Sequence, residues 1–180
     1  RQDGNQLWQI PLSTDFGRHV IAPNVYGDVV IVGSHQFGLV ATRVITEEGT
    51  IRIEEAWKRG KEAGPNISSP VLVGDHLYQL VSETVMCIDA RTGETTWTKE
   101  GLINSGDRRA FAAFLGMDDK IVMLTDMGEL ILLQADPKAY HELSRTQVCG
   151  KNWCHPAFAN GIMVVRDFKK LVCADLTQGE

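Results

Sequence analysis

Short apolar runs separated by turn residues dominate the chain, and no long segment keeps a helical period. Val29-Val30-Ile31-Val32 and Leu130-Ile131-Leu132-Leu133 are such runs, and turn pairs such as Gly27-Asp28 and Asn160-Gly161 interrupt the chain between runs. Gly-Asp and Asn-Gly favour the left-handed conformations that tight hairpins require. A continuous apolar run is typical of a strand buried on both faces, as between stacked sheets. The pattern therefore predicts an all-β, antiparallel fold.

One unit recurs along the chain. Each copy begins with a proline, a short apolar stretch, a Gly-Asp or Asn-Gly turn and then a β-rich run; the prolines are Pro23, Pro70 and Pro156. Phe114 stands where the proline is expected in a weaker fourth copy, so the successive intervals are 47, 44 and 42 residues. A period of about 40–45 residues with several short strands indicates β-propeller blades.

Each unit is expected to hold four strands. The third strands follow second hairpins near Gly33–Gly38, Ser82–Thr84, Thr125–Gly128 and Asp167–Lys170. Gln6-Leu7-Trp8 is interpreted as a fourth strand without its own first three, and Leu171–Asp175 as a third strand without a fourth. We therefore expect one domain over residues 1–180, with blades at about 9–58, 59–98, 99–148, and 149–180 together with 5–9.

The two ends of the chain allow three interpretations of how a ring is completed. An open arc would expose the broad faces of its terminal blades. We expect the chain to be part of a larger ring of roughly six to eight blades, because the family that the tryptophan motif below resembles usually has more blades. Closure of four blades by the chain's own ends, or a dimer of two half rings, are the alternatives. Because the first residue is Arg1, the chain is expected to be a mature product or an excised piece.

A tryptophan motif carries a family resemblance. The segment Asp89-Ala90-Arg91-Thr92-Gly93-Glu94-Thr95-Thr96-Trp97 resembles the tryptophan-docking motif of PQQ-like, quinoprotein-dehydrogenase-like propeller repeats. Gly93 supplies a positive φ at the turn, and Trp97 can lay its ring on the neighbouring blade while its N–H reaches a main-chain carbonyl. Trp57 and Trp8 stand at the same place in the preceding units. The third unit lacks the tryptophan, and the first has a longer hairpin around Glu47-Glu48-Gly49.

The loops that join strand four to the next strand one share a propeller face with the loops between strands two and three. Such a face commonly carries binding. Basic and aromatic residues are expected there, and they suit an acidic peptide, a sugar or a cofactor; the alternative is an ordinary polar surface. The candidate binding residues are Arg18, His19, His35, Arg108, Arg109, Trp153, His155 and Arg166.

Catalytic and metal sites have weaker support. Family dehydrogenases hold PQQ with adjacent cysteines and a calcium ion, but the chain has no Cys-Cys pair, and Glu83 and Asp126 suit hairpin turns as well as calcium. Cys149, Cys154, His155 and His141 suggest zinc, yet no second clean ligand pair exists. A Cys149–Cys154 disulfide is also open, whereas Cys87 and Cys173 are expected in the core. We expect no catalytic residue, metal or cofactor, with PQQ and calcium as the alternative.

Composition limits the partners. The net charge of −5 argues against nucleic acid, and no apolar run is long enough to span a membrane. We therefore predict a non-catalytic binding or scaffolding module for a protein or small ligand, the alternative being a fragment of a PQQ-dependent dehydrogenase. Further blades or a second copy are the other expected partners. The resemblance implies a periplasmic or extracellular bacterial setting, although a cytoplasmic one stays open.

Overall fold

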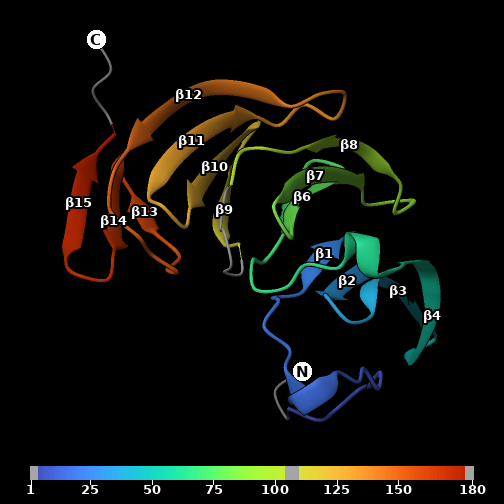
Figure 1. Cartoon of the computed structure of the whole chain (residues 1–180). Coiled ribbons are helices and arrows are strands. Elements are labelled where there is room, and N and C mark those ends of the chain that lie inside the picture. The colour runs from blue at the N-terminus through green and yellow to red at the C-terminus, as the bar shows by residue number, and fades with distance from the viewer. Residues whose placement is uncertain (1–3, 104–109, 177–180) are drawn as a thin grey trace.

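The structure is a computed structural model that describes residues 4–103 and 110–176. Four antiparallel sheets lie side by side in an arc (Figure 1), which confirms the predicted partial propeller. The first sheet comprises β1 (Asn24–Tyr26), β2 (Val29–Ser34), β3 (Gly38–Glu47) and β4 (Thr50–Arg59). The second comprises β5 (Val71–Val73), β6 (His76–Val81), β7 (Thr84–Asp89) and β8 (Thr95–Lys99). The third comprises β9 (Ala112–Met117), β10 (Lys120–Thr125), β11 (Glu129–Gln134) and β12 (His141–Gln147). The fourth comprises β13 (Ala157–Ala159), β14 (Ile162–Arg166) and β15 (Leu171–Asp175).

Helical structure is sparse in these ranges. It consists of two 3₁₀ turns, η1 (Asp15–Gly17) and η2 (Lys61–Ala63). Within the described part of the chain, no helix is long and apolar enough to cross a membrane.

The four sheets repeat one register. The first hairpin of each sheet pairs the residues on either side of its turn: Tyr26 with Val29, Val73 with His76, Met117 with Lys120, and Ala159 with Ile162. This register puts Phe114 in the place of the prolines, as the sequence predicts. Proline has no N–H to donate to a ladder, and β1, β5 and β13 each start directly after one. Without proline, β9 starts two residues before Phe114 and is twice as long.

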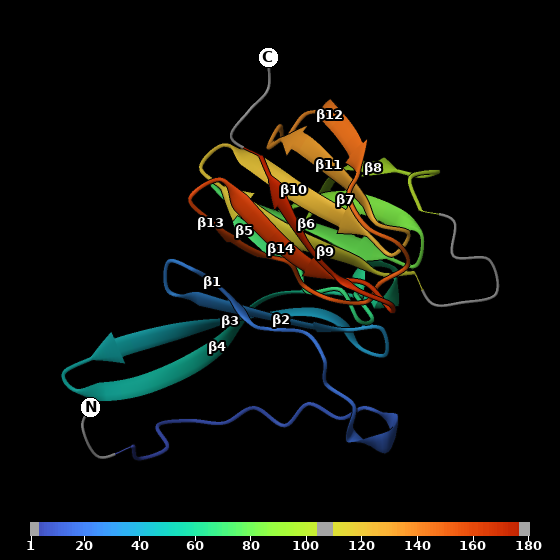
Figure 2. The ribbon, with the colours of Figure 1, turned by 90° about the vertical axis from the view of Figure 1, so that its left-hand side faces the viewer.

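The first sheet differs by the long hairpin between its third and fourth strands. Both β3 and β4 have ten residues, and the pair projects beyond the other sheets (Figure 2). The turn between them has Glu48 and Gly49 at φ 48° and 82°. This is the longer hairpin predicted around residues 47–49.

Apolar side chains fill the spaces between neighbouring sheets. The first interface contains Ile31, Ala41, Leu77, Met86 and Ile88. The second contains Tyr78, Val85, Cys87, Ile121, Met123 and Ile131. The third contains Val122, Leu124, Leu130, Met163 and Val165. Strands of the inner sheets are therefore buried on both faces, as their continuous apolar runs predict.

Two indole rings join outer strands to the next sheet. The Nε1–H of Trp57 donates to the Ala90 carbonyl oxygen at 2.9 Å, and that of Trp97 donates to the Asp136 carbonyl oxygen at 2.8 Å. The Trp57 ring lies on the turn at Gly93, where a Cβ atom would come within 2.6 Å of Cε3 of the ring. The motif around residues 89–97 therefore serves two interfaces, since its turn receives one tryptophan and its own tryptophan contacts the following sheet.

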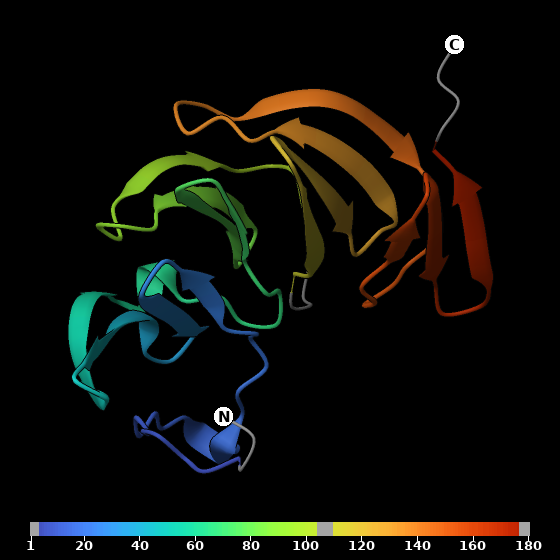
Figure 3. The same cartoon turned by 180° about the vertical axis from the view of Figure 1, so that it is seen from behind.

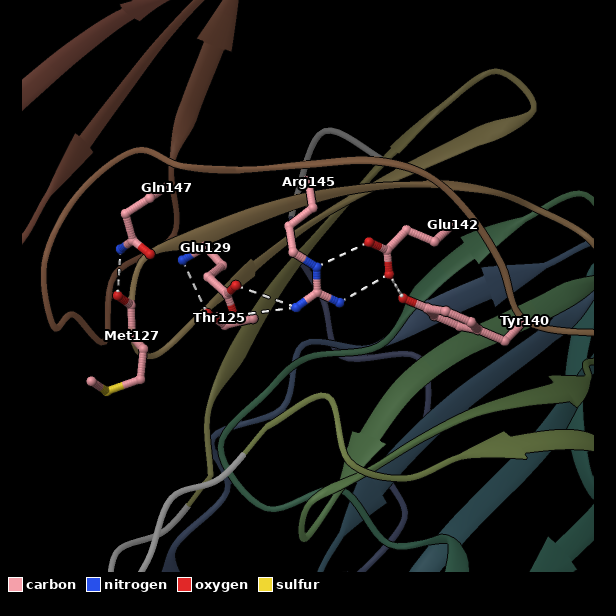
Figure 4. A network of polar contacts seen from close by, with 7 residues as sticks. All are labelled: Thr125, Met127, Glu129, Tyr140, Glu142, Arg145 and Gln147. Atoms are coloured by element: carbon pink, nitrogen blue, oxygen red, sulfur yellow. Dashed lines mark hydrogen bonds and ion pairs between the residues drawn. The ribbon is translucent and has the colours of Figure 1, made fainter.

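The third sheet has a polar network on its outer strand instead. Arg145 donates to both carboxylate oxygens of Glu142 at 2.9 Å, and its Nη1 lies 3.3 Å from the Glu129 carboxylate (Figure 4). Tyr140 donates its hydroxyl to Glu142. These bonds tie β12 to β11 within one sheet rather than to the next. The register position of Trp57 and Trp97 is occupied by Ser144, which pairs with Leu132 as Trp97 pairs with Cys87.

The two ends of the arc correct two expectations. Residues 4–14 form no strand, and the sheet of β13–β15 has three strands in the described ranges, so Trp8 does not complete it. The reason is distance: the N-terminal segment lies beside the first sheet, at the opposite end of the arc from β15 (Figures 1 and 3). Cys173 is exposed rather than in the core, because no further sheet covers β15 among the described residues.

Candidate binding face

Tight turns bring two sets of loops onto one face. A Cβ atom at Gly38, where β3 begins after the β2–β3 turn, would lie 2.0 Å from the Arg59 carbonyl oxygen, and one at Gly128, in the β10–β11 turn, would lie 2.2 Å from the Cys149 carbonyl oxygen. Both glycines have φ near +87°, a conformation that other residues rarely adopt. The turn between strands two and three therefore packs directly on the loop that leaves strand four, and the two sets share the face.

At the first sheet, this face carries an arginine held by an amide and an imidazole. Arg18 Nη2 donates to Asn66 Oδ1 at 2.9 Å and lies 3.1 Å from His35 Nε2. These three side chains come from three different loops. Among the described residues, Arg18 has no carboxylate within 4.0 Å.

The segment before β1 positions that cation. The Asp15 backbone N–H donates to Gln36 Oε1 at 2.6 Å, and Gln36 Nε2 donates to Asp15 Oδ2 at 3.1 Å. Thr14 Oγ1 donates to the Arg18 carbonyl oxygen. His19 packs on Phe37 with ring centroids 6.0 Å apart. These contacts attach the segment to the β2–β3 turn.

At the third and fourth sheets, a buried asparagine joins the loops. Asn152 is fully buried; its Nδ2 donates to the Thr125 carbonyl oxygen at 3.0 Å and its N–H to the Asp126 carbonyl oxygen at 2.9 Å. Asp167 accepts from the Gly150 N–H at 3.0 Å. The β12–β13 loop is thereby bonded to both turns beside it.

Asp126 leaves one carboxylate oxygen without a partner. Its side chain is 3% exposed, and its Oδ1 makes no hydrogen bond. Burial raises the pKa of this carboxyl, partly offset by Lys151, while Glu83 raises it further. Calcium needs six to eight oxygen ligands. Within residues 4–103 and 110–176 no three His, Cys, Asp or Glu side chains converge on one point.

Large apolar side chains stand exposed around this junction. Met127 is 50% exposed, Trp153 47% and Phe168 60%. We call these three residues the apolar rim. Each follows directly on a bonded residue of the junction, since Asp126 precedes Met127, Asn152 precedes Trp153 and Asp167 precedes Phe168. Exposed apolar side chains on a rigid, hydrogen-bonded support are typical of a surface that contacts another protein.

The predicted site residues divide between these two clusters. Arg18, His19 and His35 lie at the first cluster, and Trp153 and Arg166 are exposed near the second. His155 packs edge-on against Phe111, with centroids 5.9 Å apart. Arg108 and Arg109 lie outside the described residues. Asn66, Met127 and Phe168 were not predicted, because an amide acceptor and single apolar residues in turns have no distinctive sequence pattern.

The four cysteines are free thiols. Cys149 is buried and donates its Sγ–H to the Gly150 carbonyl oxygen, and burial raises its pKa. His141 lies at the far end of β12 from Cys149, so the four groups considered for zinc do not meet.

A charged hollow lies elsewhere, at the tip of the β3–β4 hairpin. It is lined by Glu47, Glu48, Thr50 and Arg52. Pockets for small molecules are mostly apolar and enclosed. This open, charged hollow therefore does not compete with the face as a ligand site.

Comparison with known proteins identifies relatives. The family model described as outer membrane protein assembly factor BamB matches residues 1–99, more than half of the chain. No curated protein matches significantly in sequence. BamB from Moraxella catarrhalis is similar in structure, with a TM-score of 0.64 and 18% identity, over 86% of this chain and 45% of that one.

Two computationally designed proteins are also similar in structure. Ika8 has a TM-score of 0.59 and 14% identity over 88% of this chain and 46% of its own. Ika4 has a TM-score of 0.58 and 12% identity over 96% of this chain and 99% of its own. At these identities the likeness concerns the fold. The chain spans less than half the length of the BamB and Ika8 structures.

Proposed function

Because the chain belongs to the PQQ-like propeller family described as outer membrane protein assembly factor BamB, we propose that it is a non-catalytic module that holds a protein partner. The partner contacts the face that carries the loops between strands two and three. The apolar rim of Met127, Trp153 and Phe168 is the observation that carries this proposal. Aromatic and methionine side chains are enriched at the centres of protein interfaces.

Arg18 defines the chemistry of the partner further. Its guanidinium is half-buried and bonded to an amide oxygen and an imidazole, and no carboxylate of the described residues pairs with it. A carboxylate that approaches it forms a charge-assisted hydrogen bond. The partner therefore presents apolar side chains to the rim and an acidic residue to Arg18. The family's description supports a bacterial cell-envelope setting for this contact.

Site-specific photo-crosslinking in the natural host tests the proposal. A photoreactive phenylalanine analogue at Trp153 is expected to capture one discrete protein. The matched control is the same analogue at Leu143, which is 41% exposed in β12 of the third sheet, toward the end of that strand away from the face. Equal capture at both positions, or none at Trp153, would contradict a partner on this face.

A charge variant tests the second contact. Arg18→Gln keeps a donor for Asn66 but removes the charge, and it is expected to weaken partner binding about tenfold. Arg52→Gln on the projecting hairpin serves as the control. Equal effects of the two variants would show that net charge alone is responsible.

A further inference from the structure

Two cysteines stand at the ends of one loop between the third and fourth sheets. Cys149 and Cys154 enclose four residues, among them Asn152 and Trp153. Both cysteines are free thiols, so the structure describes the reduced form of the loop. A fully extended chain would hold two such residues roughly 16 Å apart. The chain instead bends at residues 149–151, which shortens the separation between the two cysteines.

One buried amide contacts both cysteines. Asn152 Nδ2 lies 3.6 Å from Cys149 Sγ, and Asn152 Oδ1 accepts a hydrogen bond from the Cys154 N–H at 3.4 Å. The same Nδ2 donates to the Thr125 carbonyl oxygen at 3.0 Å and lies 3.3 Å from the Gly150 carbonyl oxygen. Asn152 therefore folds the loop so that the Cys149 side chain and the Cys154 backbone lie against one side chain.

The two thiols differ in a way that suits a stepwise oxidation. Cys154 is partly exposed, whereas Cys149 is only 7% exposed. Burial raises the pKa of Cys149, the nearby Asp167 and Cys154 raise it further, and Lys170 partly offsets them. Cys154 is therefore the thiol that a dissolved disulfide reaches first, and Cys149 is the thiol that reacts afterwards.

The other two cysteines are poorly placed to pair with Cys149. Cys87 is fully buried in the interface between the second and third sheets. Cys173 alternates in β15 with Val172 and Ala174, which pack in the cluster that contains Cys149. Because successive side chains of a strand point to opposite faces, Cys173 points away from that cluster. Only the cysteine of its own loop is placed to pair with Cys149.

We propose that Cys149 and Cys154 are a redox pair whose disulfide closes the β12–β13 loop and stabilises the junction beneath the apolar rim. The Cys154 thiolate attacks a small-molecule disulfide, and the S–S bond of that molecule breaks with release of one thiol. Cys149 then loses its proton and attacks the Cys154 sulfur, which releases the second small thiol. Two protein thiols are thereby oxidised, and one small disulfide is reduced to two thiols.

Closure costs little hydrogen bonding at the junction. It removes the Cys149 Sγ–H, which donates to the Gly150 carbonyl oxygen. That oxygen retains its contact with Asn152 Nδ2, and the bond from Asn152 to Thr125 involves neither sulfur. The ring that closes holds six residues and restricts the unfolded chain, so the oxidised form is expected to be the more stable one.

Oxidation of the folded chain with glutathione disulfide is the first test. A Cys173→Ser background prevents cross-links between copies through that exposed thiol. Trypsin cleaves after Lys151, between the two cysteines, so the disulfide is expected to join the tryptic peptides 146–151 and 152–166. Mass spectrometry after alkylation of the remaining thiols identifies the joined pair.

A shifted thiol is the matched control. Cys154→Ser combined with Trp153→Cys moves the thiol to a side chain that is 47% exposed, and this variant is expected to keep a glutathione adduct instead of closing a ring. Equal closure in the two chains would contradict a pair set by the positions of Cys149 and Cys154. A lasting glutathione adduct on Cys154, with Cys149 alkylated, would overturn the proposal outright.

Thermal unfolding of the oxidised and reduced forms is the second test. The oxidised form is expected to unfold about 5 °C higher, because a short ring gives a modest entropic gain. Cys154→Ser, treated with the same oxidant, is expected to show no rise. An equal or lower midpoint for the oxidised parent would mean that the ring strains the junction, and the stabilising disulfide would have to be abandoned.

Discussion

The second and third sheets are joined by a tryptophan that the third and fourth sheets lack. Trp97 spans the former interface with its indole ring, which also contacts Tyr78 and Tyr140 at centroid distances of 6.0 Å. At the latter interface Ser144 stands at that register position and is exposed. Both interfaces nevertheless have an apolar centre of fully buried side chains.

The difference shows that the outer strand has two ways to be held. Where an indole is present, the strand is attached to the following sheet. Where it is absent, Arg145 and its two glutamates attach the strand to its own sheet, and Asn152 joins the loops to the next one. Exposed ion pairs contribute little each, so the third interface depends more on its apolar centre.

The largest expected effect breaks the stronger interface. Trp97→Ala removes a ring packed between two tyrosines and is expected to lower the free energy of unfolding by about 3–5 kcal/mol. Trp97→Phe keeps an aromatic ring but loses the bond to the Asp136 carbonyl, and is expected to cost about 1 kcal/mol. Chemical denaturation followed by circular dichroism measures both. An unchanged midpoint for the alanine variant would contradict the role given to this ring.

A glycine variant attacks the first interface from the receiving side. Gly93→Ala combines φ +75° with a Cβ 2.6 Å from the Trp57 ring, and is expected to cost about 2 kcal/mol or more. Gly74→Ala is the control, since it has φ +58° but no atom within 4 Å of the added Cβ. Thermal unfolding of the pair separates the ring contact from the backbone strain; equal losses would mean that Trp57 moves aside freely.

The junction at the third interface is expected to respond to pH. The raised pKa of Asp126 means that the folded state binds its proton more tightly than the unfolded state, so the associated stability is present at low pH and is lost as pH rises through the folded pKa. Asp126→Asn cannot take up the charge that burial disfavours, so it is expected to be more stable than the parent at pH 7, with the gap closing as the pH falls into the range where the Asp126 carboxyl is protonated. Unfolding midpoints across this range measure it, and a gap that widens on acidification would contradict the assignment.

The smallest expected effect comes from adding a tryptophan ring to the interface between the third and fourth sheets, which lacks one. Ser144→Trp is expected to stabilise the third interface by about 0.5 kcal/mol, because an exposed serine gives way to a ring beside the next sheet. The Leu176 N–H donates to Gly161 as the Ala90 N–H donates to Asp75, so a carbonyl equivalent to the Trp57 acceptor is in place. Ser144→Phe isolates the indole N–H. A loss of stability in the tryptophan variant would show that β12 lies too close to the fourth sheet for a ring.

Much of this architecture could be predicted because its signals are local. Gly27-Asp28 and Asn160-Gly161 mark hairpins by backbone conformation, and the motif at residues 89–97 marks a ring contact. The failures are non-local. Trp8 has the spacing of a strand-four residue, but whether it pairs depends on a distant strand, and Cys173 has a core sequence context without a covering sheet.

The candidate face was predicted only as a set of loops. Basic and aromatic residues in those loops made Arg18, His35 and Trp153 candidates, but the residues that contact each of them come from distant parts of the sequence. Asn66 bonds to Arg18 across 48 residues, and no periodic pattern marks such a pair. The exposed turn residues Met127 and Phe168 follow from the bonded junction beneath them rather than from their own sequence context.

The division of the tryptophan motif between two interfaces has a consequence for how such chains can change length. A segment running from one strand-four tryptophan to the next begins with a ring that needs a receiving turn and ends just after such a turn, at Ala90–Gly93 in the one complete example. Insertion of an extra copy by duplication then creates junctions in which each ring meets a turn of the right shape. A duplication that began at the boundary between two sheets would also preserve the order of tryptophan rings and receiving turns along the chain. The chain can therefore gain or lose whole units without new complementary surfaces having to arise at the joint.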